Sequence, residues 1–258
     1  MGEPREIYLA ACARIAEALG HEGFSYAKSK QTLLKEAGDL TFEISFQSNR
    51  RNFLVPREGA GGWLRGVISL GRKAQILPSI AEIVSFGMVG LITHTNIRSK
   101  SIRKWRGSLK QPLRTDDVVT GGQIGNLKVK PHWIEFNLAN PATREKTINE
   151  AISLIRSIAI PYQKRFQEPQ QVISDLLEGK MPWLWEQSAL DYVACFGTRA
   201  QTQALFDRYL GEHPEQMDEF RDKFREHKTA GTRALLLDAR RAGRLAQSAV
   251  SLDLKPGD

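Results

Sequence analysis

The sequence predicts an α+β protein, in which an N-terminal helix and a long central helix cover an antiparallel sheet and an all-helical C-terminal region follows. Three observations predict this fold class. Residues 39–48 alternate strictly between apolar and polar side chains, which is typical of a strand with one buried face. Residues 141–166 repeat apolar side chains at helical spacing, and only helical patterns follow them. We therefore expect an α+β domain over 1–166, a helical region over 167–250 and a flexible tail over 251–258.

The first elements are a helix and a hairpin. Apolar residues at helical spacing predict a helix from Glu3 to Ala18, and the glycines that follow suit its C-terminal cap. A strand over 31–36 then turns at Gly38 into the strand over 39–48. The apolar side of that second strand carries Leu40, Phe42, Ile44 and Phe46, and its opposite side is a polar sheet face of Glu43, Ser45 and Gln47. An ordinary solvated sheet face explains this row, and a binding face is the functional alternative.

These first elements resemble a bacterial family of small helix-plus-antiparallel-sheet domains of unknown function. The residues that carry the resemblance are Leu19-Gly20, Gly23-Phe24, the strand Phe42–Gln47 and the segment Val67–Gly71, within a match over roughly 5–160. The resemblance implies an α+β fold with no assigned activity and no catalytic set. By analogy with some domains of that kind, it also suggests an immunity protein that neutralises a toxin.

Further strands are expected over 63–70 and 132–138, with a short helix over 79–86 between them. The glycine-rich stretch 120–126 lacks the context of a phosphate-binding loop and predicts a loop between strands. Pro161 should stop or kink the central helix.

The most basic part of the chain is residues 98–114, which contain seven cations, one tryptophan and no acid before Asp116. A solvated loop is the ordinary explanation of such a segment. If one stretch contacts an acidic partner, we expect it to be this one, through Arg98, Lys100, Arg103, Lys104, Trp105, Arg106 and Lys110. Cations around an aromatic ring would equally suit a single-stranded nucleic acid.

In the C-terminal region we expect several short helices. The first ends at Gly179, a capping box of Thr198 and Gln201 opens another, and the last runs from Arg233 to Leu245. The absence of a fixed repeat length favours a bundle over a repeat array.

No established catalytic or metal-binding motif is present, so we predict no catalytic residues, no metal and no cofactor. Carboxylates paired across strands, Glu43 and Glu135, are the one alternative for metal or acid–base chemistry. Cys12 and Cys195 fit buried reduced thiols. The absence of a signal peptide and of a long apolar stretch predicts a cytoplasmic protein without a membrane span.

The net charge of +8 and the pI near 9.6 favour an acidic partner. We expect a non-enzymatic partner-binding protein, of the bacterial immunity type, that docks an acidic protein. One alternative is a nucleic-acid-binding protein that uses residues 98–114, and another is an uncharacterised hydrolase or nuclease.

Overall fold

The computed structural model confirms the predicted α+β class. It describes residues 3–49, 52–54, 87–110, 112–127, 132–181, 184–230 and 240–256. The strand expected over 63–70, the helix over 79–86 and the start of the last predicted helix lie outside these described residues.

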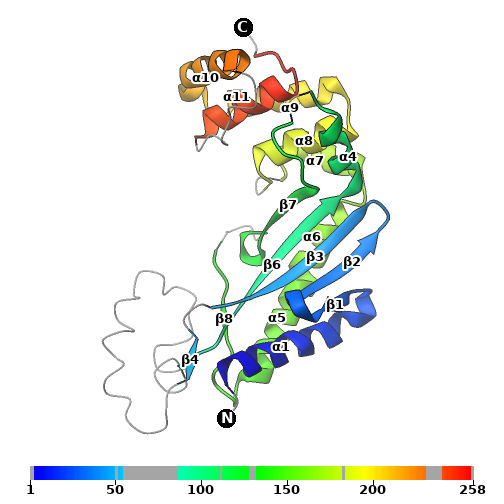
Figure 1. The fold of residues 1–258 in the computed structure, drawn as a ribbon, viewed down its shortest axis with the longest axis vertical. Helices are drawn as coiled ribbons and strands as arrows, with labels where there is room; N and C mark the ends of the chain where they lie inside the picture. Colours follow the sequence, from blue (N-terminus) through cyan, green and yellow to red (C-terminus); the bar gives the residue numbers. More distant parts are fainter. Residues whose placement is uncertain are drawn as a thin grey trace, which may run out of the picture. The chain divides into compact units, whose positions relative to one another are not determined.

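Among the described residues, six strands form the main sheet in the order β1-β2-β3-β6-β7, with β8 also paired to β6 (Figure 1). These strands are β1 (Ser25–Ala27), β2 (Thr32–Ala37), β3 (Leu40–Ser48), β6 (Gly90–Ser99), β7 (Val118–Gln123) and β8 (Phe136–Asn137). A separate antiparallel pair joins β4 (Phe53–Leu54) to β5 (Gly87–Met88).

Strand β3 confirms the alternation that the sequence predicted. Its four apolar side chains are at most 6% exposed, whereas Thr41, Glu43 and Ser45 are only partly buried. The turn before it contains Gly38 at φ +61°, a left-handed conformation that glycine adopts without a side-chain clash. The predicted hairpin is therefore present, with its turn at the predicted glycine.

Two elements differ from the sequence prediction, one at a glycine-rich stretch and one at an alternating apolar pattern. The predicted loop over 120–126 is wrong, since β7 continues to Gln123. At Gly121 a Cβ atom would lie 1.9 Å from Oδ1 of Asn96, so this glycine serves close strand packing and not a turn. The strand predicted over 132–138 is regular only at Phe136–Asn137.

The central helix passes through Pro161 without ending. Helix α5 (Arg144–Leu154) continues through a π-helical turn, Ile155–Ala159, into α6 (Ile160–Arg165). Pro161 follows this wider turn directly, as the second residue of the new α-helical segment, so the missing N–H of proline falls where the hydrogen-bond pattern of the helix changes. The helix therefore does not stop at Pro161, and that part of the prediction is wrong.

Contacts divide the chain into two compact units. Unit 1 comprises residues 1–37, 41–96 and 121–163, and unit 2 comprises 38–40, 97–120 and 164–258. The sequence predicted one boundary near residue 166, close to the break after Gln163. It did not predict that residues 38–40 and 97–120 belong to the C-terminal unit.

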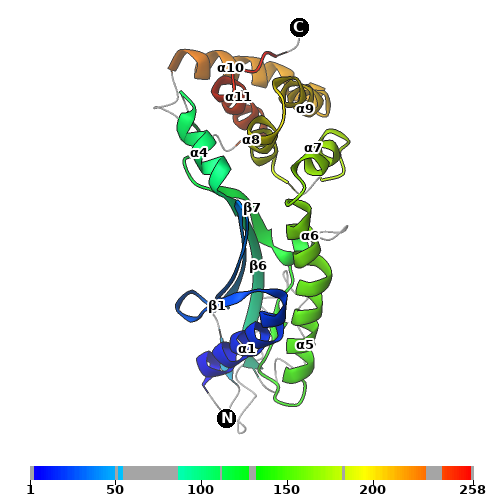
Figure 2. The same cartoon turned by 90° about the vertical axis from the view of Figure 1, so that its right-hand side faces the viewer.

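In unit 1, helix α1 (Pro4–Leu19) lies beside α5, and both pack on the sheet (Figures 1 and 2). The Tyr8 hydroxyl donates a 2.7 Å hydrogen bond to the Phe46 carbonyl, which ties α1 to β3. On the same side of the sheet, the Gln163 amide donates to Oγ1 of Thr95 at 2.8 Å.

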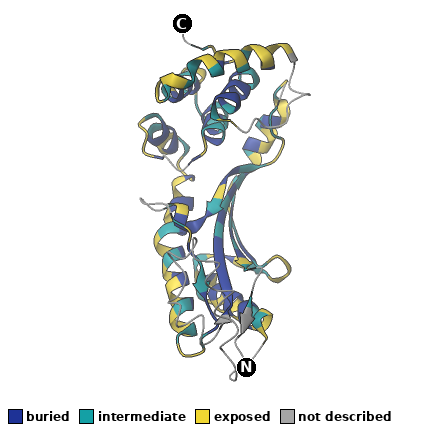
Figure 3. Cartoon of the chain, turned by 90° about the vertical axis from the view of Figure 1, so that its left-hand side faces the viewer, coloured by how far each residue is buried: buried dark blue, intermediate teal, exposed yellow. Residues whose placement is uncertain are grey.

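The described α-helices of unit 2 all contribute buried residues to its core (Figure 3). They are α4 (Lys100–Ser108), α7 (Pro169–Leu177), α8 (Glu186–Phe196), α9 (Arg199–Gly211), α10 (Met217–Ala230) and α11 (Arg241–Ser251). Both bonds of the predicted capping box at Thr198 and Gln201 are present, at 2.8 and 3.2 Å. The phenyl rings of Phe206 and Phe220 meet in the core with their centroids 5.8 Å apart.

The chain end was predicted to be a flexible tail from residue 251, but its described part packs on unit 2. Leu254 is 3% exposed, and its N–H bonds to the Ala249 carbonyl at 2.8 Å. The buried leucine explains the difference, since burying an apolar side chain offsets the entropy of ordering a short segment. Among the described residues, no helix combines the length and the apolar character that a membrane span requires.

Candidate functional site

Helix α4 occupies most of the predicted basic segment, and its first turn is fixed by an aspartate from the β2–β3 turn. The Asp39 carboxylate accepts hydrogen bonds from the Ser99 hydroxyl and, at 2.9 Å each, from the N–H and the hydroxyl of Ser101. The Ser99 hydroxyl oxygen in turn accepts from the Ile102 N–H at 3.1 Å. These bonds satisfy backbone donors that a helix N-terminus leaves unpaired, and the carboxylate suits the positive end of the helix.

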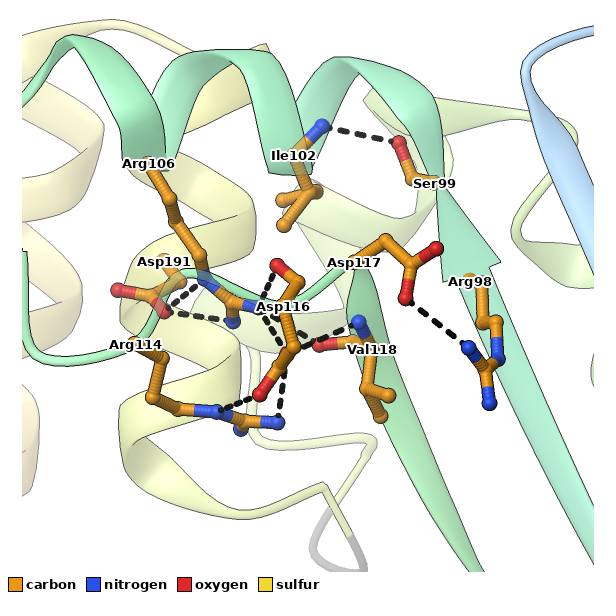
Figure 4. Close-up of polar contacts among 9 residues, drawn as sticks. All are labelled: Arg98, Ser99, Ile102, Arg106, Arg114, Asp116, Asp117, Val118 and Asp191. Atoms are coloured by element: carbon orange, nitrogen blue, oxygen red, sulfur yellow. Dashed lines mark hydrogen bonds and ion pairs between the residues drawn. The ribbon is translucent and has the colours of Figure 1, made fainter.

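The centre of α4 is held by the buried guanidinium of Arg106, which is 1% exposed (Figure 4). Its Nε and Nη2 both donate to Oδ2 of Asp191 on α8, at 2.9 and 2.7 Å. Its Nη1 donates to Oδ1 of Asp116 at 2.8 Å, and to the carbonyls of Asp116 and Val118 at 3.0 Å each. This one side chain therefore joins α4 to α8 and to the segment that leads into β7.

The two aspartates differ in solvation. Burial raises the pKa of Asp191, and the positive charge of Arg106 opposes this rise. For Asp116 burial also favours the protonated form, but the Arg114 hydrogen bond and charge, the Val118 N–H and Arg106 together lower its pKa. Asp116 also has Arg114 as a partner and its side chain is 46% exposed, whereas Asp191 is 13% exposed. Asp191 thus depends on Arg106 more strongly than Asp116 does.

The structure separates the predicted binding residues into two groups. Arg98 pairs with Asp117 at 3.3 Å, and Arg106 is buried in the network above. The prediction that Arg106 contacts a partner is therefore wrong, because its side chain has no accessible surface to offer. Lys100 is exposed at the start of α4.

Three of the predicted binding cations are available on the surface. Arg103, Lys104 and Lys110 are exposed, and none has an acidic partner among the residues that the structure describes. Trp105 is partly buried, and its side chain lines an open groove of about 940 Å³ in unit 2. We call this cavity the α4 groove.

The α4 groove is formed by the end of α4, by α8, α9 and α10, and by residues 249–256, which include the end of α11. It is lined by Trp105, Ser108, Leu109, Lys110, Ala194, Arg199, Thr202, Phe224, Lys228 and residues 249–256. Four cations line it against one carboxylate, Asp253, which pairs with Arg199 at 3.1 Å. Lys228 and Lys255 are exposed, and their ammonium groups have no carboxylate partner among the described residues. Sequence reasoning missed both, because they lie far from 98–114 along the chain.

The predicted polar sheet face lies in unit 1. Glu43 accepts a 3.4 Å hydrogen bond from the Asn96 amide, while Ser45 is partly buried and Gln47 is exposed. The Asn49 N–H bonds to the Gly90 carbonyl and the Lys100 N–H bonds to the Asp39 carbonyl, so β3 and β6 run antiparallel in a register that places His94 opposite Ser45. The His94 ring meets Trp133 edge-on at 6.3 Å, and Trp133 is 50% exposed. No sequence motif marks this His–Trp pair.

The alternative of paired carboxylates on the sheet is not supported by this geometry. The Glu135 carboxylate accepts a 2.6 Å hydrogen bond from Asn49, which lies six residues beyond Glu43, about 20 Å along an extended strand. Burial raises the pKa of Glu135, and its hydrogen bonds oppose that rise. Within the described part of the chain, no group of three or more histidine, cysteine or acidic side chains could hold a metal ion.

The structure thus offers a basic groove beside an anchored helix and, separately, a polar sheet face. Comparison of the chain with models of protein families, with curated proteins and with solved structures gave no match, so a functional conclusion depends on this geometry alone.

Proposed function

We propose that the protein is a non-enzymatic binding protein that docks an acidic protein partner on the basic surface of unit 2. The observation that carries this proposal is the set of lysines around the α4 groove, Lys110, Lys228 and Lys255, whose ammonium groups lack carboxylate partners among the described residues. Like charges gathered at one place repel each other, and an acidic surface relieves that repulsion as it docks. Arg103 and Lys104 extend the same positive potential along α4.

The way α4 is held supports a binding role. Asp39 fixes its first turn and Arg106 fixes its middle, so its outer cations project from an ordered helix. A surface that is ordered before docking loses less conformational entropy than a mobile loop. A toxin-neutralising protein of the immunity type would use such a surface, because charge steering speeds the capture of its target.

Nucleic acid is the second candidate, and Trp105 favours it. An aromatic side chain next to lysines can stack a base while the lysines neutralise phosphates. The two candidates differ in how binding responds to nuclease treatment and to nucleic-acid probes.

The test is affinity capture from the native cell, with and without nuclease treatment, at about 50 mM and about 300 mM salt. The variants are Lys104→Glu and Lys110→Glu together, compared with Lys164→Glu. Lys164 is exposed on α6 in the same unit and does not line the groove, so Lys164→Glu shows the effect of a charge reversal outside the groove.

We expect a nuclease-resistant protein partner that wild type and Lys164→Glu capture at low salt and that the double variant loses. Capture that disappears with nuclease, together with retardation of random-sequence DNA or RNA, would replace the protein partner with nucleic acid. Capture that is equal for all variants and insensitive to salt would contradict both candidates.

A further inference from the structure

We infer that the α4 groove binds an extended, acidic peptide segment of the partner, with its carboxylates on the groove lysines and an apolar side chain on Trp105 and Phe224. This inference rests on the proposed function and specifies the form of the partner. It follows from how unit 2 already holds its own chain end.

The chain end shows that α9 binds an irregular peptide by its backbone. The Gln203 amide donates to the Lys255 carbonyl at 2.7 Å, and its oxygen accepts from the Lys255 N–H at 3.1 Å. The Gln203 amide thus satisfies both backbone polar groups of Lys255, a residue outside regular structure. Arg199, one turn earlier on α9, donates to the Asp253 carbonyl and, at 3.1 Å, to its carboxylate.

These contacts reveal which chemistry this side of the groove accepts. The bound segment presents the Asp253 carboxylate to a guanidinium and the backbone N–H and C=O of Lys255 to a side-chain amide. A second acidic segment beside it would present the same groups to Lys110, Lys228 and Lys255, which still lack carboxylates among the described residues. The segment that this side of the groove already holds is a peptide with a carboxylate, so we take a further acidic peptide as the occupant and test nucleic acid as the alternative.

The groove also offers an apolar surface. Phe224 stacks on Phe220 with ring centroids 5.9 Å apart, and Phe220 contacts Phe206 in the core. Phe224 and Lys228 are four residues apart on α10 and therefore share a face. Trp105 on α4 and Leu109, the residue that caps α4, are also four residues apart, and both line the groove. Aromatic anchors between cations suit a segment in which acidic and apolar residues are mixed.

The experiment measures fluorescence anisotropy with a labelled peptide of about twelve residues, in which glutamates are mixed with a few leucines. Two matched probes are the same peptide with glutamine in place of glutamate, and a labelled oligothymidylate of the same length. The proteins are the full chain as wild type, Lys110→Glu, Lys228→Glu, Trp105→Ala and the control Lys164→Glu. Circular dichroism and thermal unfolding of each variant establish that it is folded.

We expect the glutamate peptide to bind wild type and Lys164→Glu equally, and the glutamine peptide to bind at least tenfold more weakly. Each lysine reversal should weaken binding about tenfold, because it replaces an attraction with a repulsion. Trp105→Ala should weaken it by about tenfold or more, because it removes an aromatic anchor.

Tighter binding of the oligothymidylate, lost in the same lysine variants, would overturn the inference in favour of nucleic acid. If the peptide fails to bind while the native partner is still captured through Lys104 and Lys110, the inference fails and the proposed function stands. If neither peptide nor native partner binds, both fail.

Discussion

Replacement of Arg106 by methionine should destabilise unit 2 more than any other single loss of charge in α4. The substitution removes five hydrogen bonds and leaves the Asp191 carboxylate, 13% exposed, without its cation. The cost at Asp116 is smaller, because Arg114 still pairs with its carboxylate and its side chain is 46% exposed. The stranded Asp191 charge therefore dominates the cost.

Breaking a buried ion pair from one side costs about 3–5 kcal/mol. In a chain of this size that corresponds to a fall of about 6–20 °C in the midpoint of thermal unfolding. Arg106→Lys should lose an intermediate amount, since a single ammonium group cannot reproduce the planar fork that reaches both aspartates.

The assay is thermal and urea unfolding of wild type, Arg106→Met, Asp191→Leu and the double variant. The double variant should recover much of the stability, because it leaves no charge unpaired. Arg103→Met, on the exposed side of the same helix, should change the free energy of unfolding by less than about 0.5 kcal/mol. A cost below about 1 kcal/mol for Arg106→Met, or no recovery in the double variant, would refute the reasoning.

Three further predictions concern a thiol, a glycine and a histidine. Burial raises the pKa of Cys195 from 9.0 to about 11, so its thiolate fraction at pH 8 should be about 100-fold lower than that of an ordinary cysteine. Iodoacetamide labelling followed by mass spectrometry should then speed up about tenfold per pH unit, and labelling as fast as that of a free thiol would contradict this. Gly125→Ala should lower the free energy of unfolding in urea by about 1–3 kcal/mol, because the new Cβ would lie 2.1 Å from the His132 carbonyl oxygen. The control is Gly122→Ala, whose Cβ would have no atom within 4 Å. Equal stabilities of the two variants would count against the packing argument. Burial lowers the pKa of His94, so the native state binds this proton less readily than the unfolded chain, and stability should fall as pH drops below the ordinary 6.5. His94→Gln should reduce that fall in melting temperature between pH 7 and pH 5, and a fall as large as that of wild type would show that His94 is not responsible.

The candidate site shows where sequence reasoning reached its limit. The sequence identified residues 98–114 as basic, and Trp105 and Lys110 do line the groove. It counted Arg106 with the surface cations, because nothing in the local pattern reveals that Asp191, 85 residues later, lies beside it. Lys228 and Lys255 were missed for the same reason, since they come near Trp105 only when the chain folds.

The sequence by itself determined the α+β class, the alternation of β3, the hairpin turn at Gly38 and the capping box at Thr198. Each depends on side chains within a few residues of one another, where backbone periodicity and turn geometry decide the outcome. Only the tertiary structure decided which cations are buried and which remain on the surface. It also decided that the chain end packs, because burial and pairing depend on residues that are distant in sequence and adjacent only in the folded protein.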